Sequence, residues 1–257
     1  MKVSIYTNQL PESESLKKEL AVLLKQNGHS IDDLKPHVVI FIGGDGTFLR
    51  AVHQYIDILD SVCFLGLNSG SLGFFLDIAK DDFSKVLSLL DNKDAFLKEH
   101  HLIECSINNK KTIYAVNEVR LENPFHTLIC NVDINNERLE TFRGNGLVVS
   151  SELGSSAYNK SLGGALIDHD LNALELSEIA PIENNVYRSL GSSLVVSSKS
   201  TIELSGHIEE CLIGYDHFVE KDIKPKTLLI KKSNKTVKIL YPKNHSYVSS
   251  IKRSFIK

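Results

Sequence analysis

The hydrophobic periodicity of this chain changes near residue 100, and the change limits the folds that the chain can adopt. Before that point, continuous apolar runs alternate with segments whose apolar residues recur at helical spacing. A run such as Val38–Ile42 is typical of a parallel strand that is covered on both faces. After His100, apolar and polar residues alternate with a period of two, which is typical of antiparallel strands. We therefore predict two domains of different construction.

The N-terminal domain is predicted to be an open, mostly parallel α/β sheet. Its strands are expected at Lys2–Tyr6, Val38–Ile42 and Val62–Leu67, and each is followed by a segment of helical spacing. We expect the second helix to open at Thr47 and the third to begin just after Asp82. Residues from about 100 to 240 are expected to form an all-β sandwich with turns every 8–12 residues, for example at Asn135 and Asn136.

Composition excludes several classes of function. The formal net charge of −3 provides no basic field that would attract nucleic acid or anionic lipid. No apolar run is long enough to span a bilayer, and Met1–Tyr6 does not resemble a signal peptide. The four cysteines include no CxxC pair, so we expect free thiols rather than disulfides or a zinc site, and His169 between two aspartates is interpreted as a polar turn. We expect a cytoplasmic protein without a nucleic-acid or membrane partner.

The strand Val38–Ile42 runs directly into the sequence GGDGT, which comprises Gly43, Gly44, Asp45, Gly46 and Thr47. Glycines allow a phosphate to approach the backbone closely, and the helix that follows presents the positive end of its dipole. An aspartate inside an anion site is electrostatically costly, so Asp45 is expected to take a proton or hold a metal. A tight turn with a turn-favouring aspartate is the simpler alternative.

Three further segments carry polar groups in unusual places. Asn68–Gly73 and the adjacent Phe74 and Phe75 follow the next strand, where the two rings could stack on a base or pack in the core. Asn117 and Glu118 lie in an otherwise apolar strand, and a side-chain amide there can pair with the edge of an adenine. Residues 154–165 combine small hydroxyl residues, Tyr158 and a Gly-Gly bend, which is more detail than a generic turn requires.

Taken in order, these segments resemble NAD kinases of the short bacterial type over nearly the whole chain. The matching stretches are GGDGTFLRA, NSGSLGFF, VNEV, GNGLVVS and GSSAYNKSLGGAL. GGDGT alone is shared with kinases of the diacylglycerol-kinase and phosphofructokinase-like superfamily. The resemblance implies an α/β domain of residues 1–98 to which a tail of about 242–257 returns, and an all-β NAD-binding domain of residues 99–241.

The resemblance also implies the reaction and its residues. The terminal phosphoryl group of ATP would pass to the adenosine 2′-hydroxyl of NAD, with a divalent metal, most often Mg²⁺, as cofactor and Asp45 as general base. The enzyme would be a homodimer or homotetramer with the NAD site near a subunit interface. Gly43, Gly44, Gly46 and Thr47 would form the phosphate loop. The NAD-binding positions are Asp45, Gly46, Phe74, Asn117, Glu118, Arg143, Asn145, Ser156, Ala157, Tyr158, Ser161, Ala180 and Asp216.

This chain departs from the family pattern at two places. Asn145 stands where an aspartate is usual, and Glu152 and Leu153 replace a proline and a hydroxyl residue. A lipid kinase with the same loop and a non-catalytic NAD-binding sensor are the alternative functions. A lipid kinase would need an apolar entry or a membrane-facing surface, and the sequence shows neither a basic amphipathic helix nor an exposed apolar stretch. Retention of Asp45, Asn117 and Glu118 argues against a non-catalytic sensor.

Overall fold

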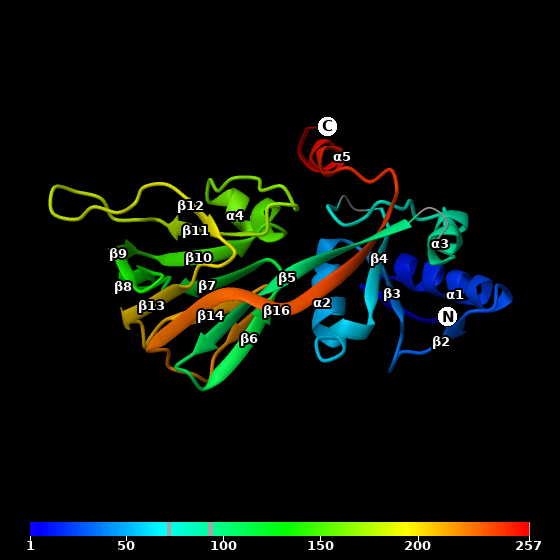
Figure 1. Ribbon diagram of the computed structural model, residues 1–257, viewed down its shortest axis with the longest axis horizontal. Coiled ribbons are helices and arrows are strands. Elements are labelled where there is room, and N and C mark those ends of the chain that lie inside the picture. The colour runs from blue at the N-terminus through cyan, green and yellow to red at the C-terminus, as the bar shows by residue number, and fades with distance from the viewer. Residues whose placement is uncertain (71–72, 92–94, 257) are drawn as a thin grey trace. The chain divides into compact units, whose positions relative to one another are not determined.

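A computed structural model describes residues 1–70, 73–91 and 95–256. The chain divides into two compact units, one of residues 1–100 together with Lys235 to the C-terminus, and one of His101–Asn234. Strands β5 (Ala95–Ile107) and β16 (Thr227–Pro242) contribute residues to both units (Figure 1).

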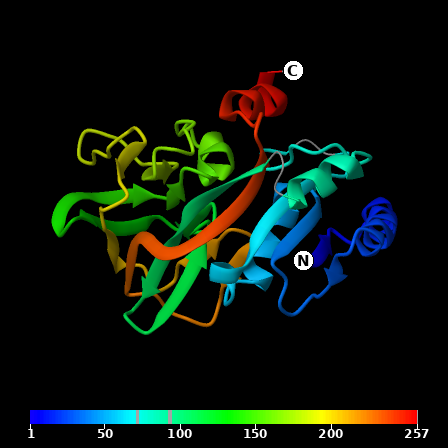
Figure 2. The same cartoon turned by 45° about the vertical axis from the view of Figure 1, so that its right-hand side comes forward.

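The first unit is built on a parallel sheet. Its strands are β1 (Lys2–Thr7), β2 (Ser30–Ile31), β3 (Val38–Gly43), β4 (Cys63–Asn68) and the end of β16, in the order β2-β1-β3-β4-β16. Each neighbouring pair is parallel, including the short pairing of Ile239 with Phe64. All six residues of β3 are buried, as expected for a strand that is covered on both faces. Figure 2 shows β3 and β4 side by side in a second view.

Helices flank this sheet and close its core. They are α1 (Pro11–Gln26), α2 (Asp45–Gln54), the 3₁₀ turn η1 (Leu59–Ser61), α3 (Phe83–Leu90), α5 (Tyr247–Ile251) and η3 (Lys252–Ile256). Helix α1 contributes Leu20 and Leu24 to a core that also contains Ile40, Ile42 and Leu65. The predicted start of α3 is confirmed, because the Asp82 side chain accepts a hydrogen bond from Lys85 N as an N-cap.

The second unit is a sandwich of two antiparallel sheets. One contains β16, β13 (Ile202–His207), β8 (Leu128–Ile134) and β9 (Glu137–Gly144), together with β5 and β6 (Lys111–Ala115). The other has the order β12 (Leu194–Ser197), β11 (Ala173–Ile179), β10 (Gly146–Ser151), β7 (Glu118–Glu122), β14 (Leu212–Tyr215) and β15 (Phe218–Glu220). Side chains from both sheets, such as Leu147 and Leu204, share one core. The predicted fold class is confirmed for both parts of the chain.

Local signals account for the ends of several elements. Asn135 and Asn136 both adopt positive φ angles, 52° and 67°, in the two-residue turn between β8 and β9. A type I′ hairpin turn requires this conformation, and asparagine tolerates it better than most residues. The predicted ends of β1, β3 and β4 differ by one residue, and two boundaries differ by more. Helix α2 begins at Asp45 rather than Thr47, and the strand expected through Asn117 is interrupted at Val116 and Asn117.

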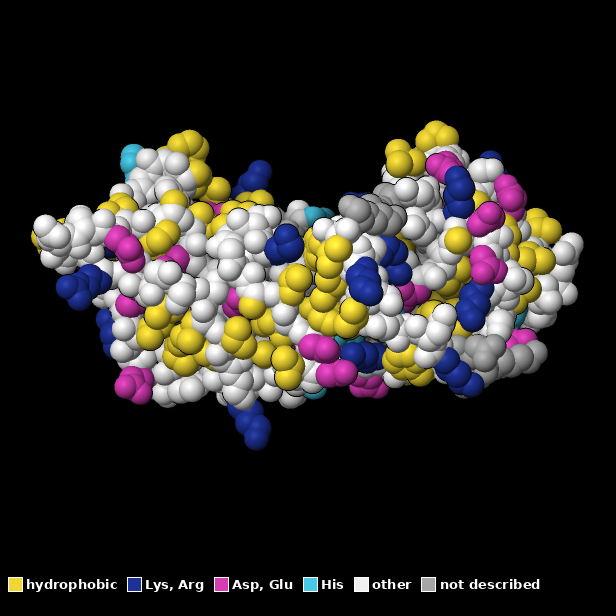
Figure 3. All heavy atoms as spheres, turned by 90° about the horizontal axis from the view of Figure 1, so that it is seen from above, with side chains coloured by type: hydrophobic (Ala, Val, Ile, Leu, Met, Phe, Trp, Pro, Cys, Tyr) yellow, Lys and Arg dark blue, Asp and Glu magenta, His cyan; other side chains and the backbone are white. Residues whose placement is uncertain are grey.

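Surface charge is mixed. Figure 3 shows Lys and Arg side chains interspersed with Asp and Glu over one face, in keeping with the small formal charge of −3. Within the described ranges, no helix has the length and apolar character needed to cross a membrane. Three of the four free cysteines are buried, and Cys63 is partly exposed.

Candidate functional site

Asp45 lies in the first turn of α2, directly after the carboxyl end of β3. Its two carboxylate oxygens each accept a hydrogen bond from Phe74 N at 2.9 Å, and Oδ1 also accepts one from Phe75 N at 3.2 Å. Both donors belong to the segment after β4. Strand β4 pairs with β3, and the register places Asn68 opposite Gly43, so the two strand ends and their loops lie together.

The balance of forces raises the pKa of Asp45. Burial of the carboxylate is the largest cause, and it outweighs the stabilisation from the Phe74 and Phe75 N–H groups and from the positive charge of Arg253. A carboxylate with a raised pKa is a stronger base than an ordinary aspartate. Gly73 is required beside it, because a Cβ there would lie 2.8 Å from Asp45 Oδ1.

Packing within the chain explains some residues of GGDGT but not Gly46. Thr47 is buried, and its hydroxyl accepts a hydrogen bond from Gly44 N at 3.3 Å. A Cβ at Gly43 would lie 2.2 Å from that hydroxyl, so Gly43 is explained by packing. Gly46 is exposed, and a Cβ there would meet only the far end of Arg50 at 3.8 Å. No contact within the described residues therefore requires glycine at position 46.

The rings of Phe74 and Phe75 are buried, each with 3% of its surface exposed. Phe75 packs on Phe48 with ring centroids 4.6 Å apart, while Phe74 packs on Tyr247 and Phe255 of the C-terminal segment. Core packing therefore explains both rings. The backbone of Phe74, rather than its ring, contacts the candidate catalytic group.

In the second unit, Asn117 and Glu118 lie where β6 ends and β7 begins. Asp216 has a left-handed backbone, with φ of 47°, and its carboxylate accepts hydrogen bonds from Val116 N at 2.9 Å and Asn117 N at 2.7 Å. These bonds replace the strand ladder, which explains the interruption at these residues. Asp216 thus holds the backbone of the Asn117 segment.

Two buried oxygens of this segment have no hydrogen-bond partner among the described residues: Asn117 Oδ1 and Glu118 Oε2. Burial, followed by the negative charge of Asp216, raises the pKa of Glu118 to about 8. Glu118 is consequently protonated near neutral pH and can donate a hydrogen bond. Unpartnered buried polar atoms are rare in proteins and are often satisfied by a ligand.

The loop after β10 packs closely on Asn117. A Cβ at Gly154 would lie 2.1 Å from the Asn117 carbonyl oxygen, which also accepts a hydrogen bond from Ser151 N at 2.8 Å. The 3₁₀ turn η2 (Gly154–Ser156) and the short helix α4 (Tyr158–Ser161) follow. Of the predicted residues on this loop, Ser156, Ala157 and Tyr158 are partly exposed and Ser161 is exposed.

Tyr158 connects this loop to β7. Its hydroxyl donates to Glu122 Oε1 at 3.5 Å, and the guanidinium of Arg120 lies 5.5 Å from the centre of its ring. The structure therefore brings Asn117, Glu118 and the loop of residues 154–161 together within this unit.

Sequence reasoning missed Asn159, which is fully buried. Its amide donates to Glu175 Oε2 at 2.6 Å and accepts from the Ser177 hydroxyl at 2.6 Å, while Glu175 Oε1 accepts from Ala165 N. The Gly-Gly bend packs on this amide, because a Cβ at Gly164 would lie 2.1 Å from Asn159 Nδ2. Glu175 lies in an otherwise apolar strand, as Glu118 does. That pattern in the sequence could have indicated a buried polar partner such as Asn159.

Arg143, Asn145 and Ala180 form a separate group at the ends of β9 and β11. The Arg143 guanidinium lies 4.2 Å from the centre of the Tyr187 ring, and Ala180 is exposed with φ of 45°. The Asn145 amide donates to Asn123 O at 3.1 Å. An aspartate could not donate this bond, so asparagine at position 145 has a structural role.

Glu152, which departs from the family pattern, is buried in an ion pair. Its Oε2 lies 2.5 Å from Lys232 Nζ, and the two side chains are 2% and 5% exposed. Lys232 also donates to His101 O at 3.1 Å. Leu153 beside it is buried as well. The unusual loop sequence is thus accommodated by an ion pair that links the loop to β16.

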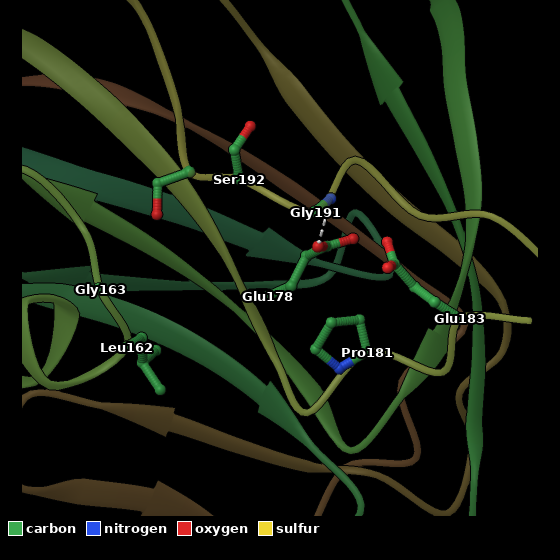
Figure 4. Close-up of a pocket in the computed structure, with 8 residues that line it drawn as sticks. Leu162, Gly163, Glu178, Pro181, Glu183, Gly191 and Ser192 are labelled. Atoms are coloured by element: carbon green, nitrogen blue, oxygen red, sulfur yellow. Dashed lines mark hydrogen bonds between the residues drawn. The ribbon is translucent and has the colours of Figure 1, made fainter.

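A pocket of about 550 Å³ in the second unit is lined by Leu162, Gly163, Glu178, Pro181, Glu183, Gly191, Ser192 and Ser193 (Figure 4). Glu178 accepts a hydrogen bond from Gly191 N at 3.0 Å at its rim. Gly163 belongs to the Gly-Gly bend noted in the sequence, and Leu162 and Pro181 directly follow the predicted residues Ser161 and Ala180. The pocket therefore borders the loop of residues 154–161 and the group at Ala180.

Comparison with known proteins decides the family. Residues 5–95 match the ATP-NAD kinase N-terminal domain, and residues 116–241 match the ATP-NAD kinase C-terminal domain. The chain is also 32% identical to an NAD kinase of Leuconostoc citreum, over 100% of this chain and 98% of that protein. The chain belongs to the NAD kinase family. It is accordingly a phosphotransferase, and the reaction of its family is the phosphorylation of NAD to NADP.

Other NAD kinases support this assignment. A Streptococcus pneumoniae NAD kinase is 39% identical over 79% of this chain and 76% of its own. The crystal structure of an Archaeoglobus fulgidus NAD kinase in complex with ATP has a TM-score of 0.80 at 17% identity, covering 98% of this chain and 99% of that one. Yeast NADH kinase complexed with NADH has a TM-score of 0.85 at 18% identity, covering 98% and 86%. These two likenesses show a shared fold.

Proposed function

We propose that this NAD kinase transfers the terminal phosphoryl group of ATP to the adenosine 2′-hydroxyl of NAD, with Asp45 as general base. The observation that carries the proposal is the Asp45 carboxylate, fixed by the Phe74 and Phe75 N–H groups at the end of β3 with a raised pKa. It would accept the proton of the hydroxyl while that oxygen bonds to the γ-phosphorus. The bond from the γ-phosphorus to the bridging oxygen breaks, and ADP leaves with the electron pair.

The phosphate groups are proposed to lie at the amino end of α2. Gly46 leaves open space there, and the positive end of the helix dipole favours an anion. The related structures with ATP and with NADH support a nucleoside triphosphate and a nicotinamide dinucleotide as the proposed substrates. Gly43 and Thr47 would shape the turn rather than touch the phosphates.

The dinucleotide is proposed to bind to the second unit through Asn117, Glu118 and the loop of residues 154–161. Asn117 Oδ1 can accept a hydrogen bond from an amino group such as that of adenine, and protonated Glu118 can donate one to a ribose or carboxamide oxygen. Ser156, Ala157, Tyr158 and Ser161 present partly or fully exposed groups beside them. Arg143, Asn145 and Ala180 would contribute from the ends of β9 and β11. Asp216 would act by holding the backbone of Asn117. Phe74, in the first unit, would act through its own backbone N–H, which holds Asp45.

A magnesium ion is proposed to accompany ATP. Mg²⁺ keeps several water ligands and is often bound mainly through substrate phosphates. In the parts of the chain that the structure describes, no group of three or more His, Cys, Asp or Glu side chains could hold a metal. The proposed ion is held by phosphate oxygens and water, and the chain binds the phosphates around it. When bound, the ion would neutralise phosphate charge.

The remaining features of the proposal concern assembly and compartment. We propose a homodimer or homotetramer in which the surface around Ala180 lies near a subunit interface; Val186 and Tyr187 there are 78% and 39% exposed. Four free thiols suit the reducing cytoplasm. The domains are proposed to be residues 1–98 with the tail of about 242–257, and residues 99–241.

The test is to incubate the purified protein with NAD, ATP and Mg²⁺ and to measure NADP. Asp45→Asn should reduce kcat by at least about 10²-fold, the lower range for loss of a general base, while calorimetry still detects NAD binding. Asp81→Asn is the matched control, because Asp81 is an exposed aspartate of the same unit. A turnover of Asp45→Asn within a few-fold of the parent would exclude Asp45 as base. Absence of NADP from the parent would exclude the reaction.

A further inference from the structure

The C-terminal segment Ser246–Ile256 packs on the residue that holds the candidate base. The Phe74 ring contacts both Tyr247 and Phe255, with ring centroids 5.7 Å and 6.1 Å away. The backbone N–H of the same Phe74 donates to both oxygens of Asp45. Any movement of Phe74 therefore changes the hydrogen bonds of the Asp45 carboxylate.

An ion-pair network fastens this segment to the chain just beyond Phe74. Asp77 Oδ1 accepts a hydrogen bond from Arg253 Nη2 at 3.0 Å, and Asp77 Oδ2 lies 2.6 Å from His245 Nδ1. Arg253 Nη2 also donates to the Ser250 hydroxyl at 3.2 Å. The Asp77, His245 and Arg253 side chains are 11%, 8% and 26% exposed, so solvent screens these pairs less than a surface salt bridge.

Arg253 also acts on Asp45 through its charge. Its guanidinium lowers the pKa of Asp45, opposing the larger effect of burial. Other titratable groups of this region include Asp77, His245 and Tyr241. The pKa of Tyr241 is raised by burial and by the charges of Asp77 and Asp45. Arg50 lies on α2 itself, where it reaches the Thr47 hydroxyl.

We propose that residues 246–256 are a positioning element for Asp45, in which Phe255 and the Arg253–Asp77 pair hold the Phe74 N–H against the carboxylate. This inference rests on the proposed role of Asp45 as general base. It assigns a function to two side chains that lie more than 200 positions from Asp45 in the sequence. Because these side chains act through Phe74, their loss should change turnover and its pH dependence more than NAD affinity.

The experiment compares Arg253→Gln with Lys252→Gln, two neighbouring cations of which only Arg253 pairs with Asp77; Lys252 is exposed. Removal of the Arg253 charge should raise the pKa of Asp45, so that the carboxylate is protonated up to a higher pH. The acid limb of the kcat profile should move up by about 0.5 pH unit, and kcat at pH 7 should fall by about tenfold, with the KM for NAD within about threefold. Lys252→Gln should match the parent in all three.

Two more variants separate charge from packing. Arg253→Lys retains a positive charge and should restore the acid limb, although not the full turnover. Phe255→Ala should lower kcat by several-fold with an unchanged acid limb, because it loosens Phe74 without removing a charge. Thermal unfolding of each variant confirms that the fold is intact before its rates are compared.

The outcomes distinguish this inference from the proposed function. If the parent makes NADP and Asp45→Asn does not, but Arg253→Gln and Phe255→Ala both behave like Lys252→Gln, the positioning role is wrong while the function stands. If Arg253→Gln and Phe255→Ala raise the KM for NAD without lowering kcat, and the acid limb does not move, the segment serves binding and the inference is also wrong. A parent that makes no NADP overturns the function itself.

Discussion

Two carboxyl groups, partly buried Asp45 in the first unit and buried Glu118 in the second, have pKa values raised mainly by burial and yet are suited to opposite tasks. Asp45 accepts three backbone hydrogen bonds and faces the positive charge of Arg253. Glu118 has a buried oxygen without a partner among the described residues and lies beside the negative charge of Asp216. Backbone N–H groups favour the ionised form, whereas an acidic neighbour favours the protonated form.

Burial alone does not determine the role of a carboxyl group, because it raises the pKa of both Asp45 and Glu118. Burial makes each group more basic, and the neighbours then favour one protonation state over the other. The N–H groups of Phe74 and Phe75 and the charge of Arg253 favour the ionised, proton-accepting form of Asp45. Glu118, with a pKa of about 8, is a hydrogen-bond donor for a ligand. The proposed catalytic base and the proposed binding group are thus two acids whose pKa values are both raised by burial and whose neighbours differ.

The largest expected effect comes from disturbing the hydrogen bonds of Asp45. In Gly73→Ala the new Cβ would lie 2.8 Å from Asp45 Oδ1 and 2.5 Å from a Leu76 methyl carbon, so the Phe74 N–H must move away. We expect kcat to fall by at least about tenfold, within the range attributed to a positioned base. Steady-state kinetics would measure this, and a double-mutant cycle with Asp45→Asn provides the control. If Gly73→Ala lowers the residual rate of Asp45→Asn equally, its effect does not act through Asp45.

A smaller effect is expected from Glu118→Gln on stability. The pKa of Glu118 is about 8 in the folded chain and 4.5 in an ordinary glutamate, so the folded state binds the extra proton between these values. The parent therefore loses stability as pH rises from about 4.5 to about 8. The glutamine variant lacks this loss. Its free energy of unfolding, relative to that of the parent, should therefore rise by more than about 1 kcal/mol from pH 5 to pH 8.

Thermal or denaturant unfolding at both pH values measures this difference, and Glu137→Gln on β9, an exposed glutamate, should show none. A constant difference between Glu118→Gln and the parent across this range would contradict the protonated state of Glu118. It would also remove the contrast with Asp45.

The smallest effect is expected at Gly46. Gly46→Ala places a methyl group in the first turn of α2 at an ordinary contact distance of 3.8 Å from Arg50 Nη1, and alanine favours a helix over glycine. The variant should unfold at the same or a higher temperature, with a gain of up to about 1 kcal/mol. Its KM for ATP should nevertheless rise several-fold if phosphates occupy that space. An unchanged KM would show that the phosphates bind elsewhere.

Much of the fold followed from local patterns in the sequence. The buried run Val38–Ile42 predicted a central parallel strand, and the asparagine pair at 135 and 136 predicted a hairpin turn. The start of α2 was wrong by two residues, because Gly44 can act as an N-cap through its backbone and Thr47 then lies inside the first turn. The strand through Asn117 was predicted as continuous. The residues near Asn117 in the sequence do not indicate that the N–H groups of Val116 and Asn117 donate to Asp216.

The sequence by itself determined the change from an α/β to an all-β construction, the glycine-rich turn between β3 and α2, and the presence of carboxyl groups in apolar surroundings. Periodicity and turn residues report on backbone conformation within a few positions, which is why these features were readable. Only the tertiary structure decided the partners of the buried polar groups. Phe74 meets Asp45 across 29 positions, Lys232 meets Glu152 across 80 and Asp216 meets Asn117 across 99. Such pairs are set by how distant segments pack, and a buried polar group takes whichever partner that packing provides.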